Sequence, residues 1–283
     1  MVRMDLASLH QELVVSSDLL IVQDLDGVCM PLVKDPLTRR LPVGYVHAAA
    51  RLRGCFCVLT NGEHEGHRGV NRLVEKALGD STLARRQGLY LPGLAAGGVQ
   101  YQDAFGQLTH PGVSEAEINF LASVPGRMKD LMTSMLQTSM PELGERELAV
   151  EVERAVLDTQ VSPTINLNSL FARIPDDVSR QRRLQSMLEE LMQQLMAMAV
   201  SEGLRNSFFL HVAPNLGRDS RGCELLKPSV VGDVGSTDIQ FMLRGAIKEA
   251  GLLVLINRHI ASRTGTAPLG DEFNVRTAPH DHD

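Results

Sequence analysis

Short apolar runs separated by longer amphipathic segments dominate the N-terminal part of the chain. Residues 19–22 and 55–59 are continuous runs of apolar side chains, which are typical of strands buried on both faces of a parallel sheet. Residues 5–16, 45–52 and 69–78 instead carry apolar side chains at helical spacing. Because strands and helices alternate along this region, the pattern predicts an α/β fold with a parallel sheet.

Helical spacing dominates the middle of the chain. Residues 99–108 alternate between polar and apolar side chains and predict a hairpin. Residues 114–158 predict helices that are interrupted at Pro125, because proline lacks the amide hydrogen that a helix interior needs. A long helix is expected over residues 178–201, whose Leu and Met stripe we interpret as core.

Four shorter elements are expected towards the C-terminus. Apolar runs over residues 208–212, 229–233 and 252–256 favour strands. The spacing over residues 239–250 favours an amphipathic helix. Strands and helices would therefore alternate here as they do near the N-terminus.

Composition narrows the class of protein. The chain has 283 residues, 43% of them hydrophobic and 22% charged, which is ordinary for a soluble globular protein. Its formal net charge of −6 and the lack of a basic stripe argue against a nucleic-acid partner. No apolar run is long enough to cross a membrane. The four cysteines lack a Cys-x-x-Cys spacing, so we expect reduced thiols in a cytoplasmic protein.

Two carboxylates follow the first predicted strand. Asp24 and Asp26 alternate with Leu25, so an extended backbone would place both on one side, and Gly27 permits a sharp turn. Neighbouring carboxylates repel each other, and a divalent cation between them removes the repulsion and also suits a phosphate-bearing substrate. The alternative is a turn that closes the strand and has only incidental affinity for Ca²⁺.

The second predicted strand ends in a similar way. Thr60, Asn61 and Gly62 follow the apolar run, and their hydroxyl and amide groups can bind a phosphate oxygen at the carboxyl edge of a parallel sheet. Thr and Asn also suit a helix N-cap. The two roles are compatible.

A third cluster of charged residues lies near the C-terminus. Asp233 follows the predicted strand over residues 229–233, and Asp238 would begin the next helix, where a carboxylate complements the positive helix end. Basic side chains precede them along the chain: Arg218, Arg221 and Lys227. The sequence therefore offers acidic and basic groups at several predicted strand ends.

Together these motifs resemble those of the haloacid dehalogenase superfamily of phosphohydrolases. The resemblance lies in an Asp-x-Asp pair, a strand-end Thr, a basic residue and a Gly-Asp acidic motif. In detail the chain is similar to the glucosylglycerol-phosphate phosphatases of salt-tolerant cyanobacteria. That similarity rests on three segments: Asp24-Leu-Asp-Gly-Val-Cys-Met-Pro-Leu-Val-Lys-Asp-Pro, Leu59-Thr-Asn-Gly-Glu, and Lys227-Pro-Ser-Val-Val-Gly-Asp-Val-Gly-Ser-Thr-Asp.

The resemblance implies an architecture and a reaction. It implies a Rossmann-like core over residues 1–87 and 215–283, with an α/β cap of the C2 type inserted over residues 88–214. The implied reaction is hydrolysis of glucosylglycerol 3-phosphate, a step towards a compatible solute for salt tolerance. An aspartyl-phosphate intermediate and Mg²⁺ are implied with it. Other sugar phosphates, such as those of sucrose or trehalose, are the alternative substrates, and a catalytically silent sugar-phosphate-binding regulator is the alternative function.

The resemblance also assigns the acidic residues. Asp24 would be the nucleophile, and Asp26 the general acid and base. Mg²⁺ would be bound by Asp24, Asp26 and Asp233, with Asp238 nearby.

The remaining roles follow from the other motifs. Thr60 would bind the phosphoryl group, with Asn61, Gly62 and Glu63 as further substrate contacts. Lys227 is the expected catalytic cation. A departure from the family pattern leaves a second candidate, because Arg221-Gly222 stands where related phosphatases have a Lys before Gly at a helix start.

Overall fold

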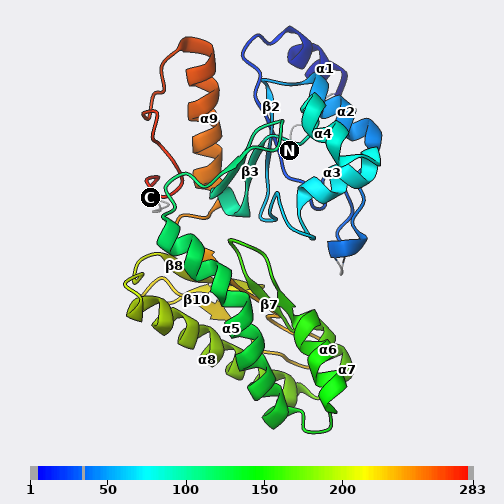
Figure 1. Cartoon of the computed structure of the whole chain (residues 1–283), viewed down its shortest axis with the longest axis vertical. Coiled ribbons are helices and arrows are strands. Elements are labelled where there is room, and N and C mark those ends of the chain that lie inside the picture. The colour runs from blue at the N-terminus through cyan, green and yellow to red at the C-terminus, as the bar shows by residue number, and fades with distance from the viewer. Residues whose placement is uncertain (1–5, 34–35, 280–283) are drawn as a thin grey trace. The chain divides into compact units, whose positions relative to one another are not determined.

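The protein divides into two compact units, which are described separately below (Figure 1). The structure is a computed structural model, and it describes residues 6–33 and 36–279. Unit 1 is formed by residues 1–111 and 247–283, and unit 2 by residues 112–246. Helices and a sheet with parallel strands confirm the predicted α/β class.

Unit 1 is built on a five-stranded sheet with the order β1-β2-β3-β4-β5. The first three strands are parallel, and the last two pair in the antiparallel sense. The strands are β1 (Ile21–Gln23), β2 (Phe56–Leu59), β3 (Gly93–Ala95), β4 (Gln100–Gln102) and β5 (Leu108–Thr109). Because β1, β2 and β3 are parallel, their carboxyl ends share one edge of the sheet.

Helices lie on both faces of this sheet (Figure 1). In unit 1 they are α1 (Leu6–Val15), η1 (Pro36–Thr38), α2 (Val43–Arg51), α3 (Val70–Leu78), α4 (Ser81–Gln87), η2 (Ala96–Gly98) and α9 (Lys248–Thr264). Helix α2 connects β1 to β2, while α3 and α4 connect β2 to β3. Helix α9 packs against β2 and β3 on the other face.

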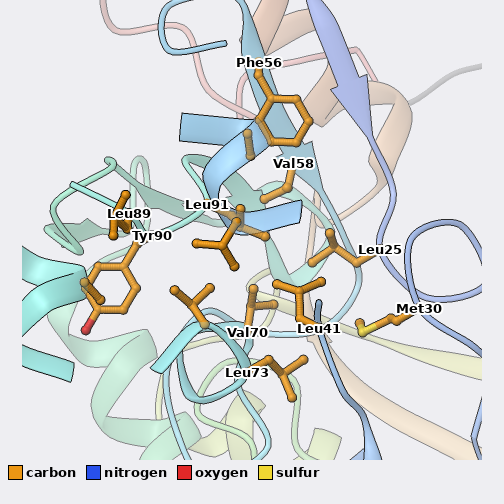
Figure 2. Packing of buried hydrophobic residues seen from close by; sticks show 14 residues of the cluster. Leu25, Met30, Leu41, Phe56, Val58, Val70, Leu73, Leu89, Tyr90 and Leu91 are labelled. Atoms are coloured by element: carbon orange, nitrogen blue, oxygen red, sulfur yellow. The ribbon is translucent and has the colours of Figure 1, made fainter. Parts of the chain in front are cut away.

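The main core of unit 1 fills the space between the sheet and helices α2 to α4 (Figure 2). Leu25, Val58 and Leu91 come from the strands or their ends, and Val46 and Leu73 come from the helices; each is almost fully buried. Burying a side chain of this size stabilises the fold by about 1.5–3 kcal/mol. This packing fixes the backbone on which the residues after β1 and β2 are displayed.

Unit 2 contains a four-stranded antiparallel sheet with the order β6-β7-β11-β8, and a two-stranded ribbon of β9 and β10. Its strands are β6 (Val156–Leu157), β7 (Thr164–Asn166), β8 (Phe208–Ala213), β9 (Asn215–Arg218), β10 (Glu224–Leu226) and β11 (Asp238–Leu243). Phe120 stacks on Phe208 with ring centroids 5.2 Å apart, and Phe208 lies 4.8 Å from Phe241. One face of the sheet is therefore held to a helix by aromatic contacts.

The helices of unit 2 agree largely with the sequence pattern. They are α5 (Glu115–Ser139), α6 (Glu145–Ala155), α7 (Asn168–Arg173) and α8 (Val178–Ser201). A capping box between Ser114 and Glu117 begins α5, and the helix continues through Pro125 instead of breaking there. Every helix among the described residues is too short or too polar to span a membrane.

Three predictions near the C-terminus are wrong. Residues 238–243 form strand β11 and not a helix, because they pair with β7 and β8 and alternate between the two sheet faces. Residues 252–256 lie inside helix α9 and not in a strand. Residues 229–233 form a turn that is closed by one isolated bridge between Val230 and Asp233.

The units also divide the chain at different points from those expected. Residues 93–109 extend the sheet of unit 1 because β3 pairs with β2, whereas we expected the insertion to begin at residue 88. Residues 215–246 belong to unit 2 because β11 lies between β7 and β8, whereas we expected the core to resume at residue 215. The insertion therefore comprises residues 112–246.

Candidate functional site

Asp24 stands directly after β1, at the carboxyl edge of the unit 1 sheet. Its Oδ1 accepts a hydrogen bond of 2.8 Å from the backbone amide of Leu25, and its Oδ2 accepts one of 2.6 Å from Nζ of Lys248. The side chain is 38% exposed. The carboxylate is thus fixed by two donors and is still open to solvent, as a reacting group needs to be.

Asp26 lies two residues after Asp24 and is paired with a second cation. Nε of Arg39 is 3.0 Å from its Oδ1. Burial raises the pKa of Asp26 above its ordinary value, and the charge of Arg39 opposes this rise. The tight turn after Asp26 requires Gly27, whose φ is +78°. The two neighbouring carboxylates therefore have different environments.

The loop after β2 is tied to the rest of the same sheet edge. Thr60 is 1% exposed, its amide donates to the carbonyl of Leu94, and its carbonyl accepts from the amide of Gly97. Its Oγ1 accepts a hydrogen bond of 3.2 Å from the amide of Gly62. Asn61, the next residue, is exposed. These contacts hold the predicted phosphate-binding loop in one conformation.

Glu63 and His64 are buried beneath this loop. The amide of His64 donates to Oε1 of Gln100 at 2.7 Å, and its Nε2 lies 3.2 Å from the carbonyl of Gly93. Among the described residues, Nδ1 of His64 has no hydrogen-bond partner. Burial lowers the pKa of His64 to about 4. The imidazole is therefore neutral near pH 7, with Nε2 as the donor to Gly93.

We expect this histidine to make the protein sensitive to acid. The unfolded chain binds a proton at the ordinary pKa of 6.5, whereas folded His64 resists protonation down to about pH 4. The free energy of unfolding should therefore fall as the pH drops through this window, by about 3 kcal/mol. Urea unfolding at several pH values measures the effect.

A pair of variants isolates the contribution of His64. His64→Gln should flatten the pH dependence between pH 6.5 and 4, even if its stability at pH 7 is lower. His47→Gln, which changes an exposed histidine on α2, should keep the full slope of the parent protein. An unchanged slope in His64→Gln would contradict the assignment.

Lys248 is a functional candidate that sequence reasoning missed. It is the first residue of α9, where a cation is unfavourable next to the positive helix end unless an anion compensates it, and Asp24 is that anion. Helix α9 approaches the sheet edge closely, because a β-carbon added at Gly98 would lie only 3.2 Å from the Cα of Gly251. The sequence signal for Lys248 would have been its place at the start of a helix. The apolar run over residues 252–256 was interpreted as a strand, so this helix was not recognised.

The expected cation and acidic motif lie in unit 2 instead. Nζ of Lys227 is 2.5 Å from Oδ2 of Asp233, and the hydrogen bond from Lys227 lowers the pKa of that carboxyl. Oδ1 of Asp233 accepts from the amide of Gly235 inside the same turn. Arg221 is 82% exposed and pairs with Asp219. These residues are therefore engaged with each other within their own unit.

Asp238 is part of the unit 2 sheet. It accepts hydrogen bonds from Nδ2 of Asn166 at 2.6 Å and from Oγ1 of Thr237 at 2.8 Å. Burial raises the pKa of Asp238. Within the part of the chain that the structure describes, no three His, Cys, Asp or Glu side chains gather as a metal centre. The four expected metal ligands are thus divided between the two units.

Comparisons with known proteins agree with the motif analysis. The family described as "Glucosylglycerol-phosphate phosphatase" matches residues 18–283. The chain belongs to this family. A glucosylglycerol-phosphate phosphatase of Synechocystis sp. is 50% identical over 279 residues, which cover 99% of this chain and 66% of that protein. Membership of the glucosylglycerol-phosphate phosphatase family implies the haloacid dehalogenase superfamily, as the motifs predicted.

The chain spans slightly less than two thirds of the length of that relative. Two solved structures are also similar to this chain. One is a trehalose-6-phosphate phosphatase related protein, with 14% identity, a TM-score of 0.42 and coverage of 87% of this chain and 73% of that one. The other is the C-terminal domain of a Candida albicans trehalose synthase regulatory protein, with 9% identity, a TM-score of 0.44 and coverage of 98% and 73%.

Proposed function

We propose that this member of the glucosylglycerol-phosphate phosphatase family hydrolyses a phosphate monoester, with glucosylglycerol 3-phosphate as its preferred substrate. The observation that carries the proposal is the pair Asp24 and Asp26 at the carboxyl end of β1, each next to its own cation. A carboxylate that reacts with phosphorus and a carboxyl that transfers a proton are the two groups that this reaction needs.

In the first step Asp24 attacks the phosphorus atom. One of its carboxylate oxygens forms a bond to phosphorus while the bond from phosphorus to the sugar oxygen breaks, and Asp26 donates a proton to the departing oxygen. In the second step Asp26 takes a proton from water, the water oxygen bonds to phosphorus, and the bond to Asp24 breaks. Inorganic phosphate and the free alcohol are the products.

The environment of each carboxyl group suits its role. The raised pKa of Asp26, caused by burial, favours the protonated form that donates to the leaving oxygen. Asp24 receives hydrogen bonds from Leu25 and Lys248, which hold its carboxylate in a fixed position. Lys248 also places a positive charge where the phosphoryl group would bind. The buried hydroxyl of Thr60 and the exposed amide of Asn61 are the proposed donors to phosphoryl oxygens.

Mg²⁺ fits the donors of unit 1. Asp24 already accepts a cation, the ammonium group of Lys248, and oxygen donors are the ligands that Mg²⁺ prefers. The carboxylate of Asp24 and the main-chain carbonyl of Asp26 would hold the ion, which would neutralise phosphate charge. Asp233 and Asp238 have partners within unit 2, so we assign the ion to unit 1 and not to them.

A reducing compartment suits this chain. Its four cysteines are free, and Cys223 is exposed. Burial raises the pKa of the Cys57 thiol to about 11, which keeps it protonated and unreactive. We therefore propose the cytoplasm as its location.

Phosphate release from a panel of esters tests the proposal. The panel holds the phosphates of glucosylglycerol, sucrose, trehalose and glucose, each with Mg²⁺ and then with EDTA. We expect release from glucosylglycerol phosphate at least tenfold faster than from the other esters, and its loss in EDTA. Faster release from another ester would support the phosphatase mechanism and contradict the proposed substrate. No release from any ester would favour a sugar-phosphate-binding regulator.

A further inference from the structure

Arg39 is a partly buried cation that the sequence motifs do not include. It follows η1 in the connection between β1 and α2, and its side chain is only 18% exposed. Nε lies 3.0 Å from Oδ1 of Asp26. A guanidinium group loses favourable hydration when it is buried, so a position of this kind needs partners that compensate for the loss.

The contact with Asp26 uses only a small part of what Arg39 can donate. Nε is fully buried, and its geometry towards Asp26 is that of an ion pair without an aligned hydrogen bond. Within the described residues, neither Nη1 nor Nη2 donates to a protein acceptor. Among the described residues, the guanidinium group therefore has N–H donors without an acceptor next to the proposed general acid.

These donors are close to the phosphate-binding loop. A β-carbon added at Gly62 would lie 3.9 Å from Nη1 of Arg39 and 3.7 Å from Oγ1 of Thr60. Gly62 has no side chain, and, apart from Gly62 and its two chain neighbours, these two atoms are the only heavy atoms among the described residues within 4 Å of the position that its β-carbon would take. An acceptor with several oxygens could occupy this space and bind to both.

We propose that Arg39 binds a phosphoryl oxygen through its Nη groups while its Nε side holds Asp26 in position. This inference rests on the proposed function and adds a second phosphate-binding cation to the site. The planar guanidinium group presents its donors in a fork that matches two phosphate oxygens, whereas Lys248 acts as a point charge beside Asp24. Arg39 thus links substrate binding to the placement of the acid.

Binding of inorganic phosphate to the full chain, measured by titration calorimetry, tests the proposal. We expect Arg39→Ala to weaken phosphate binding at least about tenfold. Arg39→Lys, which keeps the charge and removes the fork, should have an intermediate affinity. Arg40→Ala is the matched control, since Arg40 is exposed and makes no ion pair among the described residues; its affinity should equal that of the parent protein.

Three results would overturn the proposal. The first is that Arg39→Ala binds phosphate as tightly as the parent protein. The second is that Arg40→Ala weakens phosphate binding as much as Arg39→Ala does. The third is that the parent protein binds no phosphate. Circular dichroism measures whether each variant is folded. If Arg39→Ala does not fold, Arg39→Lys still tests whether the forked guanidinium donors are needed for phosphate binding.

The same measurement separates this inference from the proposed function. Phosphate binding that depends on Arg39, in a protein that hydrolyses no ester, would support the role of Arg39 and refute the phosphatase activity. If the parent protein hydrolyses an ester and Arg39→Ala binds phosphate with the same affinity as the parent, the phosphatase activity is supported and the role of Arg39 is refuted.

Discussion

Asp24→Asn should reduce phosphate release from the preferred ester by on the order of a thousandfold or more, because an amide oxygen is a poor nucleophile. The fold should survive. Asp24 is partly exposed, and losing an exposed ion pair costs about 1 kcal/mol or less. Single-turnover phosphate release measures the chemical step, and a thermal melt measures stability.

The matched control for this substitution is Asp233→Asn. It makes the same change in a turn of unit 2, where the carboxylate pairs with Lys227. We expect this variant to keep its turnover within a few-fold of the parent protein and to need the same concentration of Mg²⁺. If this variant stays folded and loses as much activity as Asp24→Asn, the result would support Asp233 as a metal ligand, as the sequence motifs predicted.

Lys248→Met should lower turnover by on the order of a hundredfold or more. Removing one charged donor from a developing negative charge typically costs this much, and the variant also leaves Oδ2 of Asp24 without its donor. Steady-state kinetics on the preferred ester measure the effect. We expect most of it in kcat, because the positive charge is most valuable when the phosphoryl group is being transferred.

Lys227→Met is the control that decides between the two lysines. Nζ of Lys227 lies 2.5 Å from Oδ2 of Asp233, which already compensates its charge, so we expect this variant to lose no more than a few-fold of its turnover. A large loss in Lys227→Met together with a small loss in Lys248→Met would contradict our assignment. It would support the assignment made from the sequence motifs.

Local signals predicted the acidic pair and the threonine of the candidate site. Asp24, Asp26 and Thr60 each follow an apolar run, and the parallel strands β1 and β2 bring these runs to one sheet edge. An aspartate or threonine next to a glycine turn can be recognised without knowledge of the fold. The ion pairs with Arg39 and Lys248 join residues that are distant in sequence, so the local pattern contains no signal for them.

The segment over residues 238–250 shows why periodicity failed elsewhere. Ile239, Phe241 and Leu243 alternate as in a strand, while Ile239, Met242 and Leu243 also fit one helix face. Ile239, Phe241, Met242 and Leu243 are all buried, so hydrophobicity alone does not separate a strand from a helix here. Pairing of β11 with β7 and β8 decides in favour of the strand, and this pairing depends on segments far away in the chain.

Helix α9 was misinterpreted for a related reason. Its run over residues 252–256 is continuously apolar, which is typical of a buried strand. In the helix, however, Val254 and Leu255 are buried, while Leu252, Leu253 and Ile256 remain exposed. Packing against β2 and β3 selects the helix, and Lys248 becomes visible as a site residue only after this choice.

The split of unit 1 along the chain has a consequence for synthesis on the ribosome. Residues 1–111 emerge before unit 2, and unit 2 is continuous, so unit 2 can fold as soon as residues 112–246 have been translated. Lys248 and the helix that packs behind β2 and β3 emerge only afterwards. Until residue 248 has been translated, the nascent chain therefore carries Asp24 and Asp26 without the ammonium group that pairs with Asp24.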